Sequence, residues 1–166
     1  MKHVDLYTDG ACSYNPGPGG WGCVLIYGEI EKELSGGVNS TTNNRMEIFA
    51  VIQGLKALKM PCNVTIYSDS AYVVNAINNG WLDSWKRNGW KNSGKDAVKN
   101  VDLWKLLLIE LEKHTCNFVK VKGHADNAYN NRCDKLATSE IKKLIEIYGA
   151  PTPKSQQIEI PVRNDI

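Results

Sequence analysis

Apolar and polar residues alternate along several short segments of the chain, which is the pattern of strands with one buried face. Residues 3–8 form the first such segment. Residues 21–28 and 30–38 keep the two-residue period, and we expect them to form a hairpin that turns near Gly28. Two more strands are expected at residues 63–68 and 117–122.

Between these strands, apolar residues recur with the period of a helix. Residues 43–59 are a clear case, and Pro61 follows the end of the segment. The apolar stripe of this segment consists of Ile48, Val51, Ile52, Leu55 and Leu58. Further helices are expected at residues 71–78, 100–113 and 131–148.

The order of these elements predicts an α/β fold with a five-stranded mixed sheet flanked by helices. The first strand and the strand at 63–68 are expected to be parallel, joined by a right-handed crossover through the first long helix. Residues 149–166 contain three prolines and no periodicity, so we expect a poorly ordered tail. The remaining residues, 1–148, are expected to form one domain.

The bulk composition adds little to this prediction. The net charge of +2 points to no particular partner, and no apolar run is long enough to cross a membrane. The five cysteines are odd in number and form no C-x-x-C pair, which is typical of free thiols in a reducing compartment. We therefore expect a cytoplasmic protein.

Four carboxylates lie where predicted strands end or predicted helices begin. Asp9 and Asp69 follow two expected parallel strands, and ligands gather at the carboxyl ends of such strands. Each carboxylate also has a structural explanation. Asp9 is able to start a turn, and Asp69 is able to cap a helix. Glu47 is able to complete a capping box with Asn44, and the dipole at the start of a helix would stabilise the negative charge of Asp134.

Considered together, the four carboxylates predict a metal site. Their convergence without a lysine or arginine between them raises at least one pKa unless a cation binds. Ligands that are all oxygen select hard divalent ions, Mg²⁺ or Mn²⁺. Two such ions roughly 3.5–4 Å apart are typical of phosphoryl-transfer sites.

A glycine-rich segment precedes the second expected strand. Gly17, Gly19 and Gly22 satisfy the G-x-G-x-x-G pattern of dinucleotide sites. Such sites require a helix to begin at this point, whereas a strand pattern follows here. We therefore interpret the glycines as a tight turn that lets another backbone approach closely.

Six motifs of the chain resemble those of the type 1 ribonuclease H family, in the right order over about residues 3–148. They are YTDGACSYNPGPGGWG, TTNNRMEIFA, SDSAYV, WKRNGWK, NVDLW and VKGHADNAYNNRCDKLA. The resemblance implies a ribonuclease H-like fold. It also implies hydrolysis of the RNA strand of RNA–DNA hybrids, with 5′-phosphate and 3′-hydroxyl products.

The resemblance also implies roles for individual residues. The family's metal ligands correspond to Asp9, Glu47, Asp69 and Asp134, which would hold two Mg²⁺ ions that Mn²⁺ is able to replace. His124 would assist proton transfer, for which an ordinary histidine pKa is suitable, although a lone histidine in a loop is more often simply solvated. Asn130 matches a position that helps to hold the attacking water.

The substrate contacts implied by the resemblance fall into two groups. Asparagine amides both donate to and accept from the 2′-hydroxyls that mark RNA. The expected minor-groove residues are Cys12, Asn15, Asn43 and Asn44, and the expected DNA-side aromatic residues are Tyr72, Trp81 and Trp85. Core packing is the alternative for Trp81, and it is the expectation for Trp104 and Trp90.

A phosphate pocket and a basic protrusion complete the resemblance. The pocket corresponds to Thr42 and Asn100, but Ser40 stands where the family often has arginine. A second departure is Ala71, where the family often has a longer polar residue near the minor groove. Residues 85–99 carry five basic side chains against one acidic residue. They belong to the stretch 81–99, which resembles the family's handle. Its expected phosphate contacts are Lys86, Arg87, Lys91 and Lys95, and a solvated charged face is the alternative.

Two other functions are compatible with these features. The first is the nuclease core of a transposase, integrase or resolvase, which shares the sheet and the acidic site. The second is a hybrid-binding module without catalysis. The complete set of carboxylates and the length of the chain favour ribonuclease H, and we expect a monomer that binds RNA–DNA hybrids and no membrane.

Overall fold

The computed structural model describes residues 1–122 and 127–149 of the chain. His124 and the expected tail beyond Gly149 lie outside the described residues. Five strands form one sheet in the order β3-β2-β1-β4-β5. β1 is antiparallel to β2 and parallel to β4, which confirms the mixed sheet. The strands are β1 (Lys2–Cys12), β2 (Gly17–Tyr27), β3 (Ile30–Thr41), β4 (Cys62–Ser68) and β5 (Thr115–Lys120).

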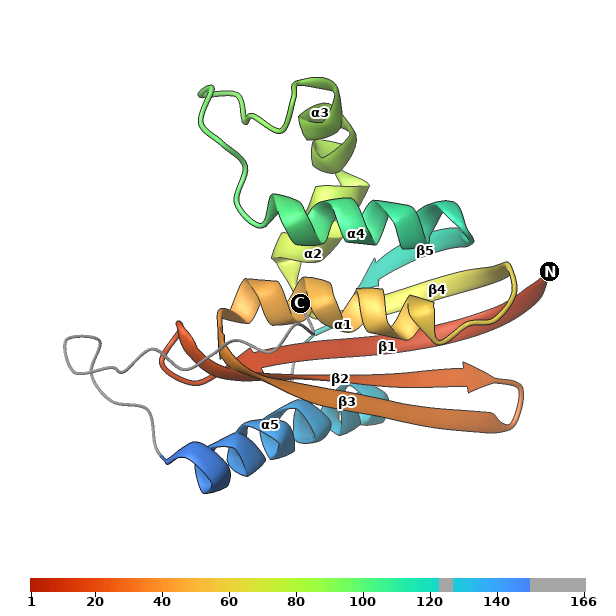
Figure 1. Ribbon diagram of the computed structural model, residues 1–166. Coiled ribbons are helices and arrows are strands. Elements are labelled where there is room, and N and C mark those ends of the chain that lie inside the picture. Colours follow the sequence, from red (N-terminus) through yellow and green to blue (C-terminus); the bar gives the residue numbers. More distant parts are fainter. Residues whose placement is uncertain (123–126, 150–166) are drawn as a thin grey trace.

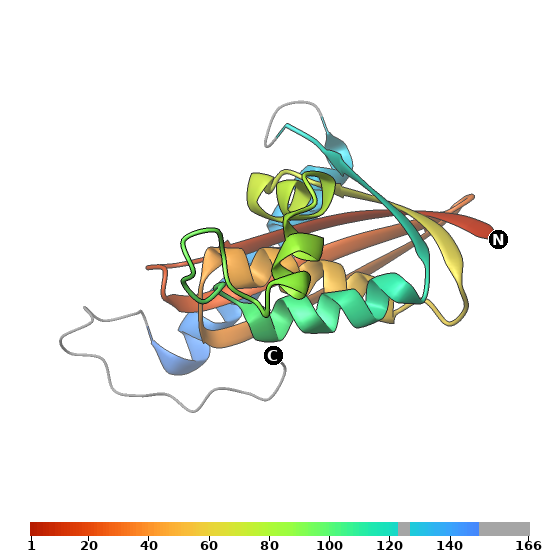
Figure 2. The same cartoon turned by 90° about the horizontal axis from the view of Figure 1, so that it is seen from above.

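Helices lie on both faces of this sheet (Figure 1). On one face α1 runs across β1, with α4 beside it, and α5 lies on the opposite face under β2 and β3. Figure 2 shows the same arrangement from above, with α4 alongside α1. The helices are α1 (Asn43–Lys56), α2 (Ala71–Asn78), α3 (Trp81–Arg87), α4 (Val101–Glu112) and α5 (Ala128–Tyr148).

The main core fills the space between the sheet, α1 and α4. Leu6 of β1 and Trp104 and Leu107 of α4 are fully buried in it. The stripe predicted for the first helix is confirmed, since four of its five residues are fully buried and Leu58 packs against the core just beyond α1. Burial of this stripe fixes α1 against β1, which decides where the start of α1 lies relative to Asp9.

β1 extends further than the sequence pattern indicates. The strand continues to Cys12, so the expectation that Asp9 ends a strand is wrong. The parallel pairing with β4 runs only to Tyr7, whereas the antiparallel pairing with β2 continues beyond Asp9. Asp9 therefore lies just beyond the point at which β1 and β4 separate, and its side chain is at the carboxyl end of the parallel part of the sheet.

The glycine-rich segment is a strand and not a tight turn. Gly22 lies in β2, where a Cβ atom would come within 2.5 Å of the Cys133 carbonyl oxygen of α5. At Gly20 a Cβ atom would lie 2.1 Å from the Ala137 carbonyl oxygen. The expected close approach of another backbone is confirmed, and it is made by a helix packed on the strand. No helix begins at this segment, which excludes the dinucleotide interpretation.

α3 is not predicted by the sequence pattern. It begins after Gly80, whose φ of 73° lies in the left-handed region that favours glycine. α3 and the segment that leads from it to α4 lie at the top of Figure 1, with α4 between them and α1. The basic residues of the expected handle therefore lie on a part of the chain that is separate from the sheet.

Candidate active site

Three of the four predicted carboxylates converge at the carboxyl end of the parallel strands. Asp9, Glu47 and Asp69 each offer an oxygen atom, and these atoms lie within 4.8 Å of one another. Asp9 comes from β1, Glu47 from α1 and Asp69 from the residue that follows β4. Asp9 and Glu47 are buried, with 6% and 4% exposure. Such a cluster of buried carboxylates is the donor set of a hard divalent cation.

The structural explanations for Glu47 and Asp69 are wrong. The N-cap of α1 is Thr42 and not Asn44, because the Thr42 hydroxyl accepts a hydrogen bond from the Arg45 N–H at 3.3 Å. Glu47 therefore lies beyond the capping-box position. The N-cap of α2 is Ser70, whose hydroxyl accepts from Val73 N–H at 3.2 Å. Neither carboxylate is needed as a cap.

One backbone N–H links Asp9 and Glu47. The Gly10 N–H donates to Asp9 Oδ1 at 3.0 Å and also to Glu47 Oε1. A Cβ atom at Gly10 would lie only 2.4 Å from the backbone carbonyl carbon of Met46, so only glycine lets α1 cross β1 this closely. The glycine after Asp9 is thus what brings the carboxylate of α1 to that of β1.

The electrostatics of the cluster favour a bound cation. Burial, followed by the charge of Asp69 and that of Asp134, raises the pKa of Asp9 to about 7. Burial and the charges of Asp9 and Asp69 raise the pKa of Glu47 well above its ordinary value. Within the described part of the chain, none of the ion pairs involves these carboxylates. A divalent cation would remove this repulsion, as the sequence predicts.

Asp134 lies beside the cluster but is not part of it. α5 begins at Ala128 with Asn127 as its N-cap, so the expected first-turn position of Asp134 is wrong. Asp134 is half-buried, and its charge contributes to the raised pKa of Asp9. One turn earlier, Asn130 is 2% exposed, and its Oδ1 has no hydrogen-bond partner among the described residues. A buried amide oxygen without a partner is uncommon and is suited to hold a ligand or water.

The expected minor-groove residues lie close to one another. The Asn15 Oδ1 atom accepts a hydrogen bond from the Asn43 N–H at 2.7 Å, which ties the loop after β1 to the start of α1. The Cys12 thiol donates to the Thr41 carbonyl oxygen at 3.2 Å. Asn15, Asn43 and Asn44 are exposed. Three side chains that carry amide groups therefore face solvent at the same end of the sheet as Asp9.

The aromatic residues divide into core and surface. Trp104 is fully buried, as expected, and Trp90 packs on the core. Tyr72 and Trp85 are half-buried, and their ring centroids lie 5.4 and 5.9 Å from that of Trp104. Trp81 is 43% exposed and lies next to Trp85. Core packing thus does not account for Trp81, and this ring is available to a ligand.

The expected phosphate pocket contains an arginine that the sequence interpretation missed. Asn100 donates through Nδ2 to the Tyr72 hydroxyl at 3.0 Å, and its Oδ1 accepts from Arg45 Nη1 at 3.3 Å. Arg45 also forms two hydrogen bonds to Asp102, at 3.0 and 2.7 Å. Ser40 is exposed and does not supply the positive charge of the arginine that the family often has at this position. Arg45 supplies a positive charge beside Asn100. Its place in the TTNNRME motif, between asparagines and Glu47, is the signal that would have identified it.

The basic residues Lys86, Arg87, Lys91 and Lys95 are all exposed on α3 and the segment after it. That segment is folded locally, since the Asn92 side chain accepts hydrogen bonds from the Gly94 and Asp96 N–H groups at 2.9 and 3.0 Å.

The sequence of the chain matches the family model of RNase H over residues 1–142. The chain belongs to the RNase H family. A ribonuclease H of Caldanaerobacter subterraneus is 60% identical over 143 residues, which cover 86% of this chain and 94% of the relative. A ribonuclease H of Acetivibrio thermocellus is 61% identical over 143 residues, covering 86% and 97%. This chain is thus an enzyme of the ribonuclease H type.

Solved structures of RNase H domains have the same fold. LC9-RNase H1, a type 1 RNase H with the type 2 active-site motif, superposes with a TM-score of 0.78 at 27% identity, over 87% of this chain and 74% of the other. A foamy viral protease-reverse transcriptase in complex with an RNA/DNA hybrid gives a TM-score of 0.73 at 26% identity. That match covers 86% of this chain and 20% of the viral protein. In the described part of the chain, every helix is too short or too polar to span a bilayer.

Proposed function

We propose that this RNase H hydrolyses the RNA strand of RNA–DNA hybrids with two divalent metal ions, Mg²⁺ or Mn²⁺, leaving 5′-phosphate and 3′-hydroxyl ends. The observation that carries the proposal is the convergence of Asp9, Glu47 and Asp69, with oxygen atoms within 4.8 Å and no cationic partner among the described residues. The catalytic domain in this proposal is residues 1–148.

The carboxylates fit the metal by chemistry and by charge. Asp9, Glu47, Asp69 and Asp134 would hold the ions, because only oxygen atoms are offered and the pKa values of Asp9 and Glu47, raised mainly by burial, favour a bound cation. Bound metal ions supply a water of lowered pKa and stabilise charge on the leaving 3′-oxygen. Asn130 would hold the attacking water through its unpartnered Oδ1. His124, outside the described residues, would assist proton transfer and product release.

The surface beside the cluster supports a hybrid substrate. Asn15, Asn43 and Asn44 offer exposed amides for the 2′-hydroxyls of the RNA strand, and Cys12 lies beside them. Tyr72, Trp81 and Trp85 would contact the deoxyribose of the DNA strand, and Thr42 and Asn100 its phosphate. The viral relative solved with an RNA/DNA hybrid supports the same substrate class.

The experiment that tests this function compares three labelled substrates of equal sequence: an RNA–DNA hybrid, double-stranded RNA and double-stranded DNA, each with and without Mg²⁺. We expect metal-dependent cleavage of the RNA strand of the hybrid alone. Cleavage of double-stranded DNA would favour an integrase-like core. Binding of the hybrid without cleavage, at any Mg²⁺ or Mn²⁺ concentration, would favour the non-catalytic module.

A further inference from the structure

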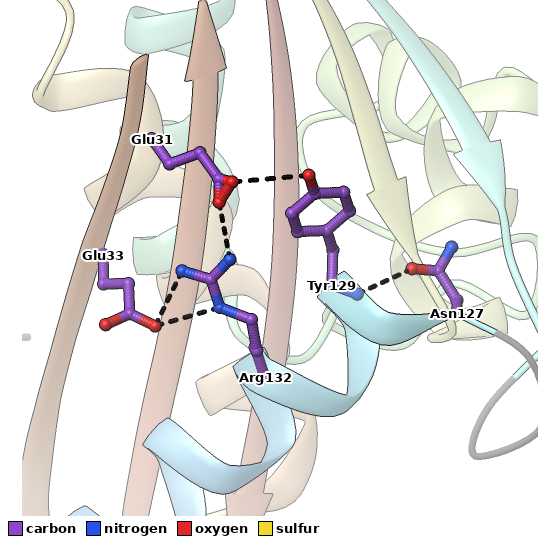
Figure 3. A network of polar contacts seen from close by, with 5 residues as sticks. All are labelled: Glu31, Glu33, Asn127, Tyr129 and Arg132. Carbon is purple, nitrogen blue, oxygen red and sulfur yellow. Dashed lines mark hydrogen bonds and ion pairs between the residues drawn. The ribbon is translucent and has the colours of Figure 1, made fainter. Parts of the chain in front are cut away.

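The first turns of α5 are fastened to the edge of the sheet by Arg132 (Figure 3). Arg132 Nη1 lies 2.8 Å from Glu31 Oε1, and its Nη2 and Nε atoms lie 3.0 and 3.1 Å from Glu33 Oε2. Both glutamates belong to β3. The Tyr129 hydroxyl lies 3.4 Å from Glu31 Oε2. One guanidinium thus bridges two carboxylates on the far side of β2 from the active-site strand.

An aromatic contact joins the same turn of α5 to β1. The Tyr129 ring lies 5.0 Å from that of Tyr7 of β1, and Tyr7 stacks on Tyr67 of β4 at 4.4 Å. Asn127 caps α5, since its Oδ1 accepts hydrogen bonds from the Tyr129 and Asn130 N–H groups at 3.1 and 3.0 Å. The start of α5 is therefore held by β1 and β3, and Tyr7 of β1 in turn stacks on β4.

The residues of α5 that contact the strands and the residues of α5 that belong to the candidate active site lie on different faces of the helix. Tyr129 and Arg132 are three residues apart and share one face, whereas Asn130 and Asp134 are four apart and share another. Among the described residues, the hydrogen bond of Asp134 to a side chain is made by its backbone carbonyl oxygen, and its carboxylate has no hydrogen-bond or ion-pair partner. Its position relative to Asp9 is set by the position and rotation of the helix.

We propose that Arg132 is a positioning residue for the metal site. By holding Glu31 and Glu33 it fixes the rotation of the first turns of α5, and this directs Asp134 and Asn130 toward Asp9. The inference rests on the proposed function, because it assigns a role in the same metal site. It concerns geometry rather than stability, since all three charged groups are partly exposed and such ion pairs contribute little to folding.

The test compares Arg132→Ala with a matched control on the same helix. Lys143 forms an ion pair with Glu140 at 3.0 Å, further along α5, so Lys143→Ala removes a pair without touching the first turns. Calorimetric titration of the metal-free proteins with Mn²⁺ alone, and the Mg²⁺ dependence of kcat, are the two readouts. We expect Arg132→Ala to weaken metal affinity about 10-fold, at the low end for groups that orient metal ligands. KM for the hybrid should not change, and Lys143→Ala should match the wild type.

Two further variants keep the proposal open to refutation. Arg132→Lys, whose single ammonium cannot bridge two carboxylates in a planar fork, should be intermediate. Glu31→Gln combined with Glu33→Gln should reproduce Arg132→Ala, and it replaces that variant if removal of the arginine prevents folding. If these variants bind Mn²⁺ and turn over as Lys143→Ala does, Arg132 is only a surface ion-pair residue. If the wild type itself neither binds the metal nor cleaves the hybrid, it is the proposed function that fails.

Discussion

Asp9 and Glu47 accept hydrogen bonds from the same donor, the backbone N–H of Gly10. The two carboxyl groups come from β1 and α1, which meet because Gly10 has no side chain. A single N–H cannot neutralise two carboxylates, and the pKa of each is raised by burial and by the neighbouring charges. A divalent cation at this site would relieve the repulsion between the two carboxylates.

Asp69→Asn should abolish hydrolysis, because it removes a negative charge that the cation requires. The fold and hybrid binding should persist, because the substitution removes no helix-capping contact. Loss of more than about 100-fold in kcat, or about 2.7 kcal/mol, is expected. Asp83→Asn, an exposed acidic residue of α3, is the control and should retain activity. A variant at position 69 with near-normal turnover would contradict its role as a ligand.

Stability of the metal-free enzyme should fall as pH rises from about 4 toward 8. The pKa of Asp9 rises on folding from 3.8 to about 7, so its contribution is present in acid and is lost as the pH passes through about 7. Saturating Mg²⁺ should raise Tm, and more at pH 8 than at pH 5, because metal competes with protons. Glu47→Gln should raise the Tm of the metal-free protein at pH 8. A Tm that is indifferent to Mg²⁺ at both pH values would count against the site.

His114 should make the opposite contribution to the pH dependence. Burial lowers its pKa, and its Nδ1 accepts a hydrogen bond from Cys62 N–H at 3.1 Å. The neutral form is therefore favoured in the fold, and the contribution is present above pH 6.5 and lost as the pH falls through the lowered pKa. The difference in Tm between wild type and His114→Asn should shrink below pH 6, whereas the exposed His3→Asn should change little. An equal difference at pH 5 and pH 7.5 would exclude this linkage.

Arg45 and Asp102 should act on the hybrid with opposite signs. Arg45→Ala removes a cation beside Asn100 and should raise KM with kcat nearly unchanged, the pattern of lost uniform binding. Asp102→Ala frees the guanidinium from two hydrogen bonds and should keep or strengthen hybrid binding. Equilibrium binding in Ca²⁺, which separates binding from turnover, is the measurement. Equal weakening by both variants would mean that the pair only joins α1 to α4.

The exposed basic residues on and after α3 should contribute binding and not chemistry. Replacing Lys86, Arg87, Lys91 and Lys95 by alanine should raise KM and leave kcat near normal. The slope of log affinity against log salt concentration should become less steep by about one unit for each phosphate that is no longer bound. Short hybrids should be cleaved as before. The matched control changes four exposed lysines elsewhere: Lys32, Lys56, Lys59 and Lys142. If kcat falls on short hybrids as well, with the salt slope unchanged, this segment supports the active site instead.

Local patterns in the sequence were sufficient to predict the fold class and the candidate chemistry. Alternation and helical period located all five strands, the hairpin turn near Gly28 and the limits of α2, because these depend on local burial and turn preferences. The motifs identified the family, and the expected convergence of four carboxylates without a basic side chain among them predicted a cation site. Such features depend on residues that are close together in the sequence, so the sequence alone is sufficient to predict them.

The packing of the helices on the sheet settled which carboxylates approach one another and what holds them. The sequence placed Asn44 at a helix cap and Asp9 at a strand end, and both were wrong, because caps and strand ends depend on which partner satisfies each backbone group. Arg45 and Arg132 went unrecognised, since their partners Asp102, Glu31 and Glu33 are remote in the chain. Contacts between distant residues follow from the tertiary arrangement of whole elements, and no local pattern encodes that geometry.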